Sequence, residues 1–269
     1  MLSHGLLHGP EARLDCWCFM RYLGGKSKIA QHLAEAMLKE TVGFPEGATT
    51  YWEPFLGGGA VASKMGHRFD FAHYSDIQPD LVLMWQALQA GWLPPQTVSY
   101  DEYQSLRYSD RPSALRGFVG FGGSFGGRFF EGYAKGGYNS DGSPRNHIAE
   151  SARAVLKDLK GMQAKRKTTF AEMDAWDISP KYGDVVYCDP PYAGTKGFSQ
   201  TLPMDHSKFW TLAESWASSG VSVFVSEYEA PQGWSCIWER SKRSSVRVGS
   251  EDRHMTIERL FTIEGTTHA

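Results

Sequence analysis

The chain alternates between short apolar runs and longer segments in which apolar residues recur at helical spacing. Between residues 29 and 39, apolar side chains return every three or four positions, which predicts a helix with one buried face. Short runs of aromatic and β-branched residues that close at Gly, Pro or Asp predict strands. We expect strands over 49–55, 71–74, 184–188, 221–225 and 257–263, and helices over 29–39, 60–65, 81–90 and 209–218.

Strands that alternate with helices predict a mostly parallel α/β sheet with helices on both faces. Three strand–helix units of about 30 residues would separate the first strand from the strand near residue 185 by roughly 90 residues. The observed separation is 134 residues. We therefore expect a sheet domain formed by 20–95 and 170–265, with a subdomain inserted over 96–169. Residues 1–19 are expected to be a disordered tail or an over-extended gene start.

Composition limits the class of protein. The chain has 269 residues, of which 41% are hydrophobic and 13% aromatic, so it is too apolar to be disordered. Four cysteines are too few for a disulfide framework, and Cys16 and Cys18 lack a second pair at metal-binding spacing. No apolar run approaches the roughly 18 residues that span a bilayer, and 1–15 has no signal-peptide core. We expect a cytoplasmic protein without a metal site or membrane contact.

Charge is unevenly distributed along the chain. The net charge of −2 argues against a generally basic nucleic-acid binder. Between residues 100 and 170, however, twelve Lys and Arg face seven Asp and Glu, an excess of five positive charges, while the remainder has an excess of seven negative charges. A basic, glycine- and aromatic-rich insertion suits contacts with phosphates, although an ordinary solvated helix explains 153–167 equally well.

A glycine turn follows the first predicted strand, in the segment 53–59 (EPFLGGG). Glycines there let a ligand approach the backbone at the carboxyl edge of a parallel sheet, and Asp76 closes the next strand about 20 residues on, where a carboxylate can bind ribose hydroxyls. The third glycine of the dinucleotide pattern is replaced by Ala62, so other adenosyl ligands are favoured over NAD. The segment 25–27 (GKS) is not a phosphate-binding loop, because Met20 stands where that motif needs its first glycine.

The tetrapeptide Asp189-Pro190-Pro191-Tyr192 closes the strand predicted over 184–188. Two prolines fix the turn, and together the four residues present a carboxylate, a carbonyl and an aromatic face. These groups can hold a planar amino group, since its two hydrogens need two acceptors and its ring needs a surface to stack on. The alternative is a rigid strand exit with an exposed tyrosine.

The order of these motifs resembles the DNA adenine-N6 methyltransferases of the Dam type, and most closely their phage and prophage members. The resemblance runs from about residue 20 to 263, through 21–26 (RYLGGK), 53–59, 75–77 (SDI), 120–128 (GFGGSFGGR), 189–192 (DPPY), 223–228 (VFVSEY) and 258–261 (ERLF). It implies a Rossmann-like methyltransferase fold whose inserted, mainly helical segment recognises the target, and S-adenosylmethionine as the cofactor. Some members belong to restriction-modification systems.

The resemblance also implies site residues. Asp189, Pro190, Pro191 and Tyr192 would be catalytic. Tyr22 and Lys26 would line the methionine end of the cofactor, and Asp76 its ribose; a solvated lysine at a helix start is the alternative for Lys26. Either Asp174 or Asp177 would lie near the cofactor's adenine. The expected cofactor-binding set is Tyr22, Gly24, Gly25, Lys26, Glu53, Pro54, Phe55, Gly57, Gly59, Asp76, Ile77, Asp174, Asp177 and Asp189.

Double-stranded DNA is the expected substrate, bound by a monomer or by a dimer on the DNA. The target adenine would be flipped out of the duplex and stacked on Tyr192. The expected DNA contacts are Arg116, Arg128, Tyr133, Lys135, Arg145, Lys196 and Arg243. Two other functions remain open: methylation of another amino group, in RNA or protein, and DNA binding without catalysis. The first is disfavoured because such enzymes more often carry Asn or Ser at the position of Asp189.

Overall fold

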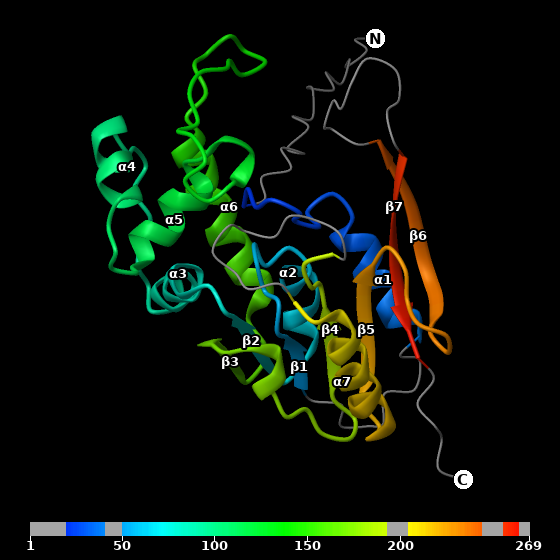
Figure 1. Cartoon of the computed structure of the whole chain (residues 1–269). Coiled ribbons are helices and arrows are strands. Elements are labelled where there is room, and N and C mark those ends of the chain that lie inside the picture. Colours follow the sequence, from blue (N-terminus) through cyan, green and yellow to red (C-terminus); the bar gives the residue numbers. More distant parts are fainter. Residues whose placement is uncertain (1–19, 41–49, 193–203, 244–254, 264–269) are drawn as a thin grey trace, which may run out of the picture.

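One sheet forms the centre of the computed structural model, which describes residues 20–40, 50–192, 204–243 and 255–263 (Figure 1). Within these residues seven strands pair in the order β3-β2-β1-β4-β5-β7-β6. They span Thr50–Glu53 (β1), Phe71–Asp76 (β2), Lys167–Glu172 (β3), Val185–Cys188 (β4), Ser222–Glu227 (β5), Ser235–Arg243 (β6) and Met255–Thr262 (β7). Strands β1 to β5 pair in parallel, whereas β7 is antiparallel to both β5 and β6.

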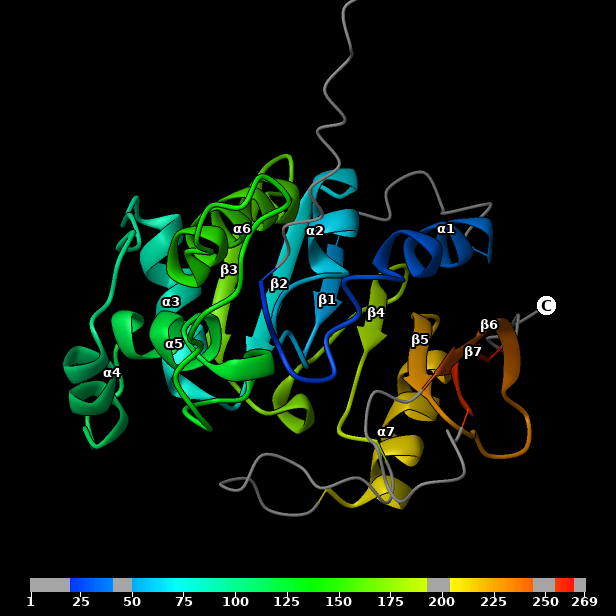
Figure 2. The same cartoon turned by 90° about the horizontal axis from the view of Figure 1, so that it is seen from above.

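Helices cover both faces of the sheet (Figure 2). The α-helices span Ala30–Glu40 (α1), Ala62–Met65 (α2), Pro79–Gln89 (α3), Tyr100–Arg107 (α4), Ala114–Gly122 (α5), His147–Met162 (α6) and His206–Ser218 (α7). Three short 3₁₀ helices span Gly66–Arg68, Phe125–Gly127 and Ala175–Asp177. The predicted Rossmann-like α/β fold, a mostly parallel sheet between helices, is confirmed.

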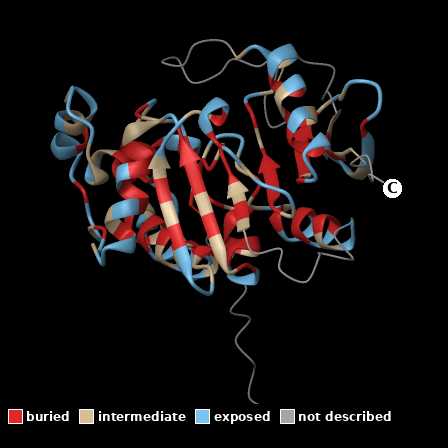
Figure 3. Cartoon of the chain, turned by 90° about the horizontal axis from the view of Figure 1, so that it is seen from below, coloured by how far each residue is buried: buried red, intermediate tan, exposed pale blue. Residues whose placement is uncertain are grey.

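Two hydrophobic clusters explain why both faces are covered. Alternate residues of a strand point to opposite faces, and in β4 all four residues are buried. Tyr187 packs into the cluster that contains α1, α2, α3, α5 and α6, whereas Val186 and Cys188 pack with Phe209 and Ala213 of α7. Figure 3 shows the resulting buried strands between helices whose outer faces are exposed.

The segment between α3 and β3 is closely packed in its glycine-rich part. The glycine-rich stretch 117–145 begins inside α5, and its residues Phe118, Val119 and Phe121 belong to the same core cluster as the sheet. Gly117 lets α5 approach α3 closely, because a Cβ there would lie 2.1 Å from the Asp80 carbonyl oxygen. Glycine content therefore reflects close helix packing in this part of the segment.

Strands β3 and β6 and helix α4 were not predicted. Strand β3 begins with a basic residue and contains two threonines, and β6 mixes polar and charged residues, so neither shows an apolar run. Helix α4 has one buried residue, Tyr103, and its helical signal lies in the Ser99–Glu102 capping box. The domain boundary expected at 169/170 falls inside β3. The assignment of 96–169 to target recognition stays a prediction, and 1–19 lie outside the described residues.

Candidate active site

The carboxyl ends of β1, β2 and β4 meet at one edge of the sheet. Strand β1 lies between β2 and β4. The chain therefore adds β2 and β3 on one side of β1 and later adds β4 and β5 on its other side. Such a switch point opens a crevice where α/β proteins bind ligands. The glycine turn after β1, Asp76 at the end of β2 and Asp189 after β4 are brought together there.

Asp76 holds the glycine turn. Its Oδ2 accepts a hydrogen bond from the Gly57 amide at 2.9 Å, and its Oδ1 accepts one from the Gln78 amide at 3.0 Å. The Trp85 indole N–H donates to the Gly57 carbonyl oxygen at 3.3 Å. Burial raises the pKa of Asp76, and the backbone N–H donors oppose that shift. The Asp76 carboxylate has further lone pairs, so it can accept ribose hydroxyls while it holds the turn.

Tyr22 packs directly on the glycine turn. Gly57 and Gly59 have φ values of +49° and +68°, which favour glycine. A Cβ on Gly57 would lie 2.9 Å from Tyr22 Cε1, and a Cβ on Gly58 would lie 2.9 Å from Tyr22 Cβ. The pKa of Tyr22 is raised well above its usual value by burial, and the charges of Asp76 and Asp189 add to this. Sequence segments 20–26 and 53–59 therefore form one surface.

The segment around Tyr22 is held by contacts with α6 and with Gly127. The Met20 amide donates to Asp158 Oδ2 at 3.3 Å, and the Arg21 guanidinium lies 2.9 Å from Glu150 Oε2; both acceptors belong to α6. The Leu23 amide donates to the Gly127 carbonyl oxygen at 3.2 Å. The segment between α3 and β3 thus supports the predicted cofactor site, a role that its sequence did not suggest.

Lys26 lies inside the site rather than in solvent. Its ammonium is 2.7 Å from Asp189 Oδ1 and 3.8 Å from Glu258 Oε2, it donates to the Gly24 carbonyl oxygen at 3.3 Å, and its side chain is 7% exposed. It also lies 4.6 Å from the centre of the Tyr192 ring, which favours a cation–π contact. The alternative of a solvated lysine at a helix start is wrong, because Lys26 is the buried counter-ion of Asp189.

Glu53 is a buried acid beside the half-buried Asp189. Its Oε2 accepts the Tyr51 hydroxyl at 2.7 Å. Burial raises the pKa of Glu53 well above its usual value; the Tyr51 hydrogen bond opposes this shift, whereas the charge of Asp189 adds to it. Glu53 therefore adds a second carboxyl group at this edge of the sheet.

Two residues of the site were given no role by sequence reasoning. Glu258 of β7 accepts the Tyr192 hydroxyl at 2.9 Å, and the Tyr228 ring, directly after β5, meets the Tyr192 ring edge-on with centroids 4.6 Å apart. The sequence feature that indicates Glu258 is an acidic residue close to the apolar residues Leu260 and Phe261 in a predicted strand. A buried acid among apolar residues needs partners, which makes it a candidate for a site.

The other predicted cofactor residues lie at the same edge. Pro54 is buried and Phe55 is half-buried, packing edge-on against Phe209 of α7. Ile77 is 50% exposed. Asp174 accepts the Trp176 amide at 3.4 Å and begins the 3₁₀ helix after β3, whereas Asp177 ends that helix and is exposed. The contacts of Asp174 and Asp177 with the cofactor stay predictions.

The predicted DNA contacts separate into two groups. Arg128, Lys135 and Arg145 are exposed between α5 and α6. Arg116 is instead largely buried in an ion pair with Asp80 of α3, and the Tyr133 hydroxyl donates to the Val98 carbonyl oxygen at 2.6 Å. Lys196 lies outside the described residues; Arg243 ends β6, and its side chain is not described.

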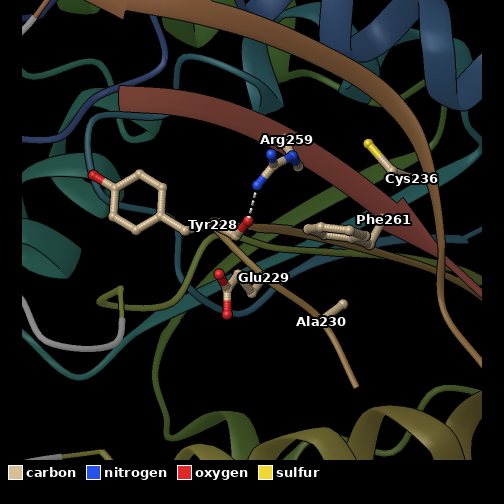
Figure 4. Close-up of a pocket in the computed structure, with 6 residues that line it drawn as sticks. All are labelled: Tyr228, Glu229, Ala230, Cys236, Arg259 and Phe261. Atoms are coloured by element: carbon tan, nitrogen blue, oxygen red, sulfur yellow. Dashed lines mark hydrogen bonds between the residues drawn. The ribbon is translucent and has the colours of Figure 1, made fainter. Parts of the chain in front are cut away.

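A hollow of about 310 Å³ is lined in part by Tyr228. Arg259 donates to the Tyr228 carbonyl oxygen there, while the Tyr228 ring points away from Cys236 and Phe261 (Figure 4). Glu229 and Ala230 complete its lining. The hollow contains none of the predicted site residues. The chemistry of the site argues for the sheet edge at Asp76 and Asp189, where buried acids and the glycine turn converge.

Neither a metal centre nor a membrane-spanning helix is seen in the described ranges. No group of three or more His, Cys, Asp or Glu side chains among them could hold a metal ion. No helix in this part of the chain is long and apolar enough to cross a membrane.

Part of the chain is similar to a known family of methyltransferases. A family model described as D12 class N6 adenine-specific DNA methyltransferase matches residues 22–109, about a third of the chain. No curated protein matches. Among solved structures, the chain is similar to a crystal structure of SMU.472, described as a candidate methyltransferase, in complex with SAH, at 14% identity and a TM-score of 0.31. That match covers 89% of this chain, which spans about half (53%) of the length of the other.

Proposed function

We propose that this protein is a site-specific DNA methyltransferase of the Dam type, which uses S-adenosylmethionine to methylate N6 of adenine in double-stranded DNA. The observation that carries the proposal is the convergence of the Asp189-Pro190-Pro191-Tyr192 turn with the glycine turn and Asp76 at one sheet edge. The family match over residues 22–109 supports it.

The residues at the sheet edge fit the cofactor. Gly57 and Gly59 have positive φ values, and the lack of a side chain at Gly57 leaves room for the Tyr22 ring against the turn. Asp76 retains acceptor capacity for ribose hydroxyls, and Tyr22 with Lys26 would line the methionine end. Bound there, S-adenosylmethionine supplies an electrophilic methyl group on a positively charged sulfur.

Asp189 and Pro190 would prepare the target amino group. Adenine N6 is a weak nucleophile because its lone pair is delocalised into the ring. Hydrogen bonds from its two hydrogens to the Asp189 carboxylate and the Pro190 carbonyl oxygen would draw the nitrogen toward a tetrahedral geometry. Both acceptors also stabilise the positive charge that develops on the nitrogen, and their fixed position avoids reorganisation during the reaction. In-line positioning supplies much of the remaining acceleration.

Access to N6 requires base flipping, because the atom that accepts the methyl group cannot be reached by these residues inside a duplex. Tyr192 offers the stacking surface, and flipping costs a few kcal/mol that contacts with the rest of the DNA must offset. Exposed Arg128, Lys135 and Arg145 are suited to phosphate contacts, each of which adds about 0.9 to the salt dependence of binding.

The test is expression in a host without DNA methylation, followed by sequencing that maps modified adenines. We expect N6-methyladenine at one short sequence motif, and none with Asp189→Ala. The control Glu239→Gln alters an exposed acid of β6 and should keep the modification. Absence of N6-methyladenine in DNA from cells that express the wild-type protein would contradict the proposal. Calorimetry with S-adenosylmethionine then separates the two alternatives. A non-catalytic DNA-binding protein would not bind the cofactor, whereas an enzyme with another substrate would.

A further inference from the structure

The ammonium of Lys26 contacts one oxygen of the carboxylate that is assigned above to the target amino group. It lies 2.7 Å from Asp189 Oδ1, which is hydrogen-bonding distance, and it covers one face of the Tyr192 ring at 4.6 Å. Both groups are assigned above to the flipped adenine. An amino group that binds at Asp189 Oδ1 displaces Lys26 from that oxygen, and the buried positive charge of Lys26 then needs another anionic partner.

Glu258 is the carboxylate within reach. Its Oε2 lies 3.8 Å from the Lys26 ammonium, so a shift of about 1 Å brings the two to hydrogen-bonding distance. Because side chains alternate along a strand, Glu258 points to the same face of β7 as Leu260, which packs into the cluster that contains α1. Lys26 shortly precedes α1, so both side chains approach the site from that face.

Glu258 also holds Tyr192. The Tyr192 hydroxyl donates to Glu258 Oε2 at 2.9 Å, the same oxygen that is nearest to Lys26. Tyr228 supports the Tyr192 ring from a second direction. The carboxylate is 11% exposed, so its hydrogen bonds compete little with water. One oxygen of the Glu258 carboxylate thus lies close to both the Tyr192 hydroxyl and the Lys26 ammonium.

We propose that Glu258 is a positioning residue that orients Tyr192 through its hydroxyl and receives the Lys26 ammonium when Asp189 binds the target amino group. This inference rests on the proposed function, because it assigns Asp189 to adenine N6. Glu258 itself does not contact the reacting atoms. Its negative charge lowers the free-energy cost of moving Lys26, and its effect should therefore fall on the turnover step rather than on cofactor affinity.

The experiment compares wild-type protein, Glu258→Gln and the control Glu239→Gln, using genomic DNA from a methylation-free host and radiolabelled S-adenosylmethionine. The glutamine side chain of Glu258→Gln keeps an oxygen for the Tyr192 hydroxyl but carries no charge. We expect kcat to fall at least tenfold in Glu258→Gln, with the Kd for cofactor within about twofold of wild type and the Glu239→Gln variant unchanged.

A wild-type kcat in Glu258→Gln overturns the inference while leaving the proposed function intact. If the wild-type protein itself transfers no methyl group to DNA, the proposed function fails instead. A second variant, Tyr192→Phe, removes the same hydrogen bond but leaves Glu258 in place. It tests the orienting role even if Glu258→Gln fails to fold. We expect it also to lower kcat at unchanged cofactor affinity, and an unchanged kcat would overturn the orienting role.

Discussion

Asp76 Oδ2 accepts a hydrogen bond from the Gly57 amide at 2.9 Å, so the acid that ends β2 fixes the turn that follows β1. This contact makes one residue responsible both for the shape of the turn and for the predicted ribose contact. The two strands are direct neighbours in the sheet, with Glu53 in register with Tyr74. Disturbing Asp76 should therefore affect the cofactor site as a whole.

We expect Asp76→Ala to weaken S-adenosylmethionine binding by at least tenfold, because a hydrogen bond to a charged group contributes about 1.5–3 kcal/mol. Asp76→Asn, which retains one acceptor oxygen for the Gly57 amide, should lose less. Isothermal titration calorimetry with S-adenosylmethionine measures both. Equal affinity in wild type and Asp76→Ala would contradict the assignment of the ribose to this acid.

Gly57→Ala should destabilise the fold more than Gly126→Ala. Both glycines have positive φ, +49° and +64°, but a Cβ at Gly126 meets nothing within 4 Å, whereas one at Gly57 meets the Tyr22 ring at 2.9 Å. The backbone conformation alone costs alanine about 1–2 kcal/mol. Denaturant unfolding should show that cost for Gly126→Ala and a clearly larger one for Gly57→Ala. Equal losses would mean that Tyr22 moves aside without cost.

Asp158 should make stability depend on pH. Burial raises its pKa from 3.8 to about 7, opposed by the hydrogen bond from the Met20 amide. Between these two pH values the folded protein holds a proton that the unfolded chain has lost, so the free energy of unfolding falls as pH rises, by at most about 1.4 kcal/mol per pH unit. Above pH 7 this contribution no longer changes.

Asp158→Asn provides the comparison, because its amide oxygen can still accept from Met20. Denaturant unfolding of wild type and variant between pH 4.5 and 8 should give curves that converge at low pH, with the wild type falling more steeply up to pH 7. Glu53 and Asp76 also have raised pKa values and are present in both proteins, so the difference isolates Asp158. Parallel curves would refute the buried, protonated Asp158.

Arg116 and Arg128 should respond differently to replacement by alanine. Arg116→Ala leaves Asp80, which is 2% exposed in its side chain, without its ion-pair partner, and breaking a buried pair costs about 3–5 kcal/mol. Arg128 is 47% exposed beside Glu131, so Arg128→Ala should leave stability within about 0.5 kcal/mol.

The two variants separate a structural arginine from a DNA-binding one. Fluorescence anisotropy with a labelled duplex should show weaker binding and a smaller salt dependence for Arg128→Ala. If Arg116→Ala unfolds at the wild-type denaturant concentration and binds DNA more weakly, Arg116 acts as the sequence predicted and its ion pair with Asp80 contributes little.

Periodic patterns predicted most of the sheet but not its edges. Strands β1, β2, β4, β5 and β7 were found because buried strands are apolar and end at glycine, proline or acid. Strands β3 and β6 lie at the two edges, where one side is solvated and polar residues are tolerated, so their sequences lack the pattern. The helix over 114–122 was obscured because its glycines permit close packing, which a single sequence does not reveal.

The order of motifs predicted the chemistry of the site, since Asp189-Pro190-Pro191-Tyr192 and the glycine turn each combine residue types suited to one task. Tertiary structure decided which side chains serve that task together. It buried Lys26 against Asp189, brought Glu258 of β7 and Tyr228, directly after β5, to the site, and paired Arg116 with Asp80. The physical reason is that local sequence encodes backbone preference and polarity, whereas pairing of buried charges depends on which strand ends the sheet order makes neighbours.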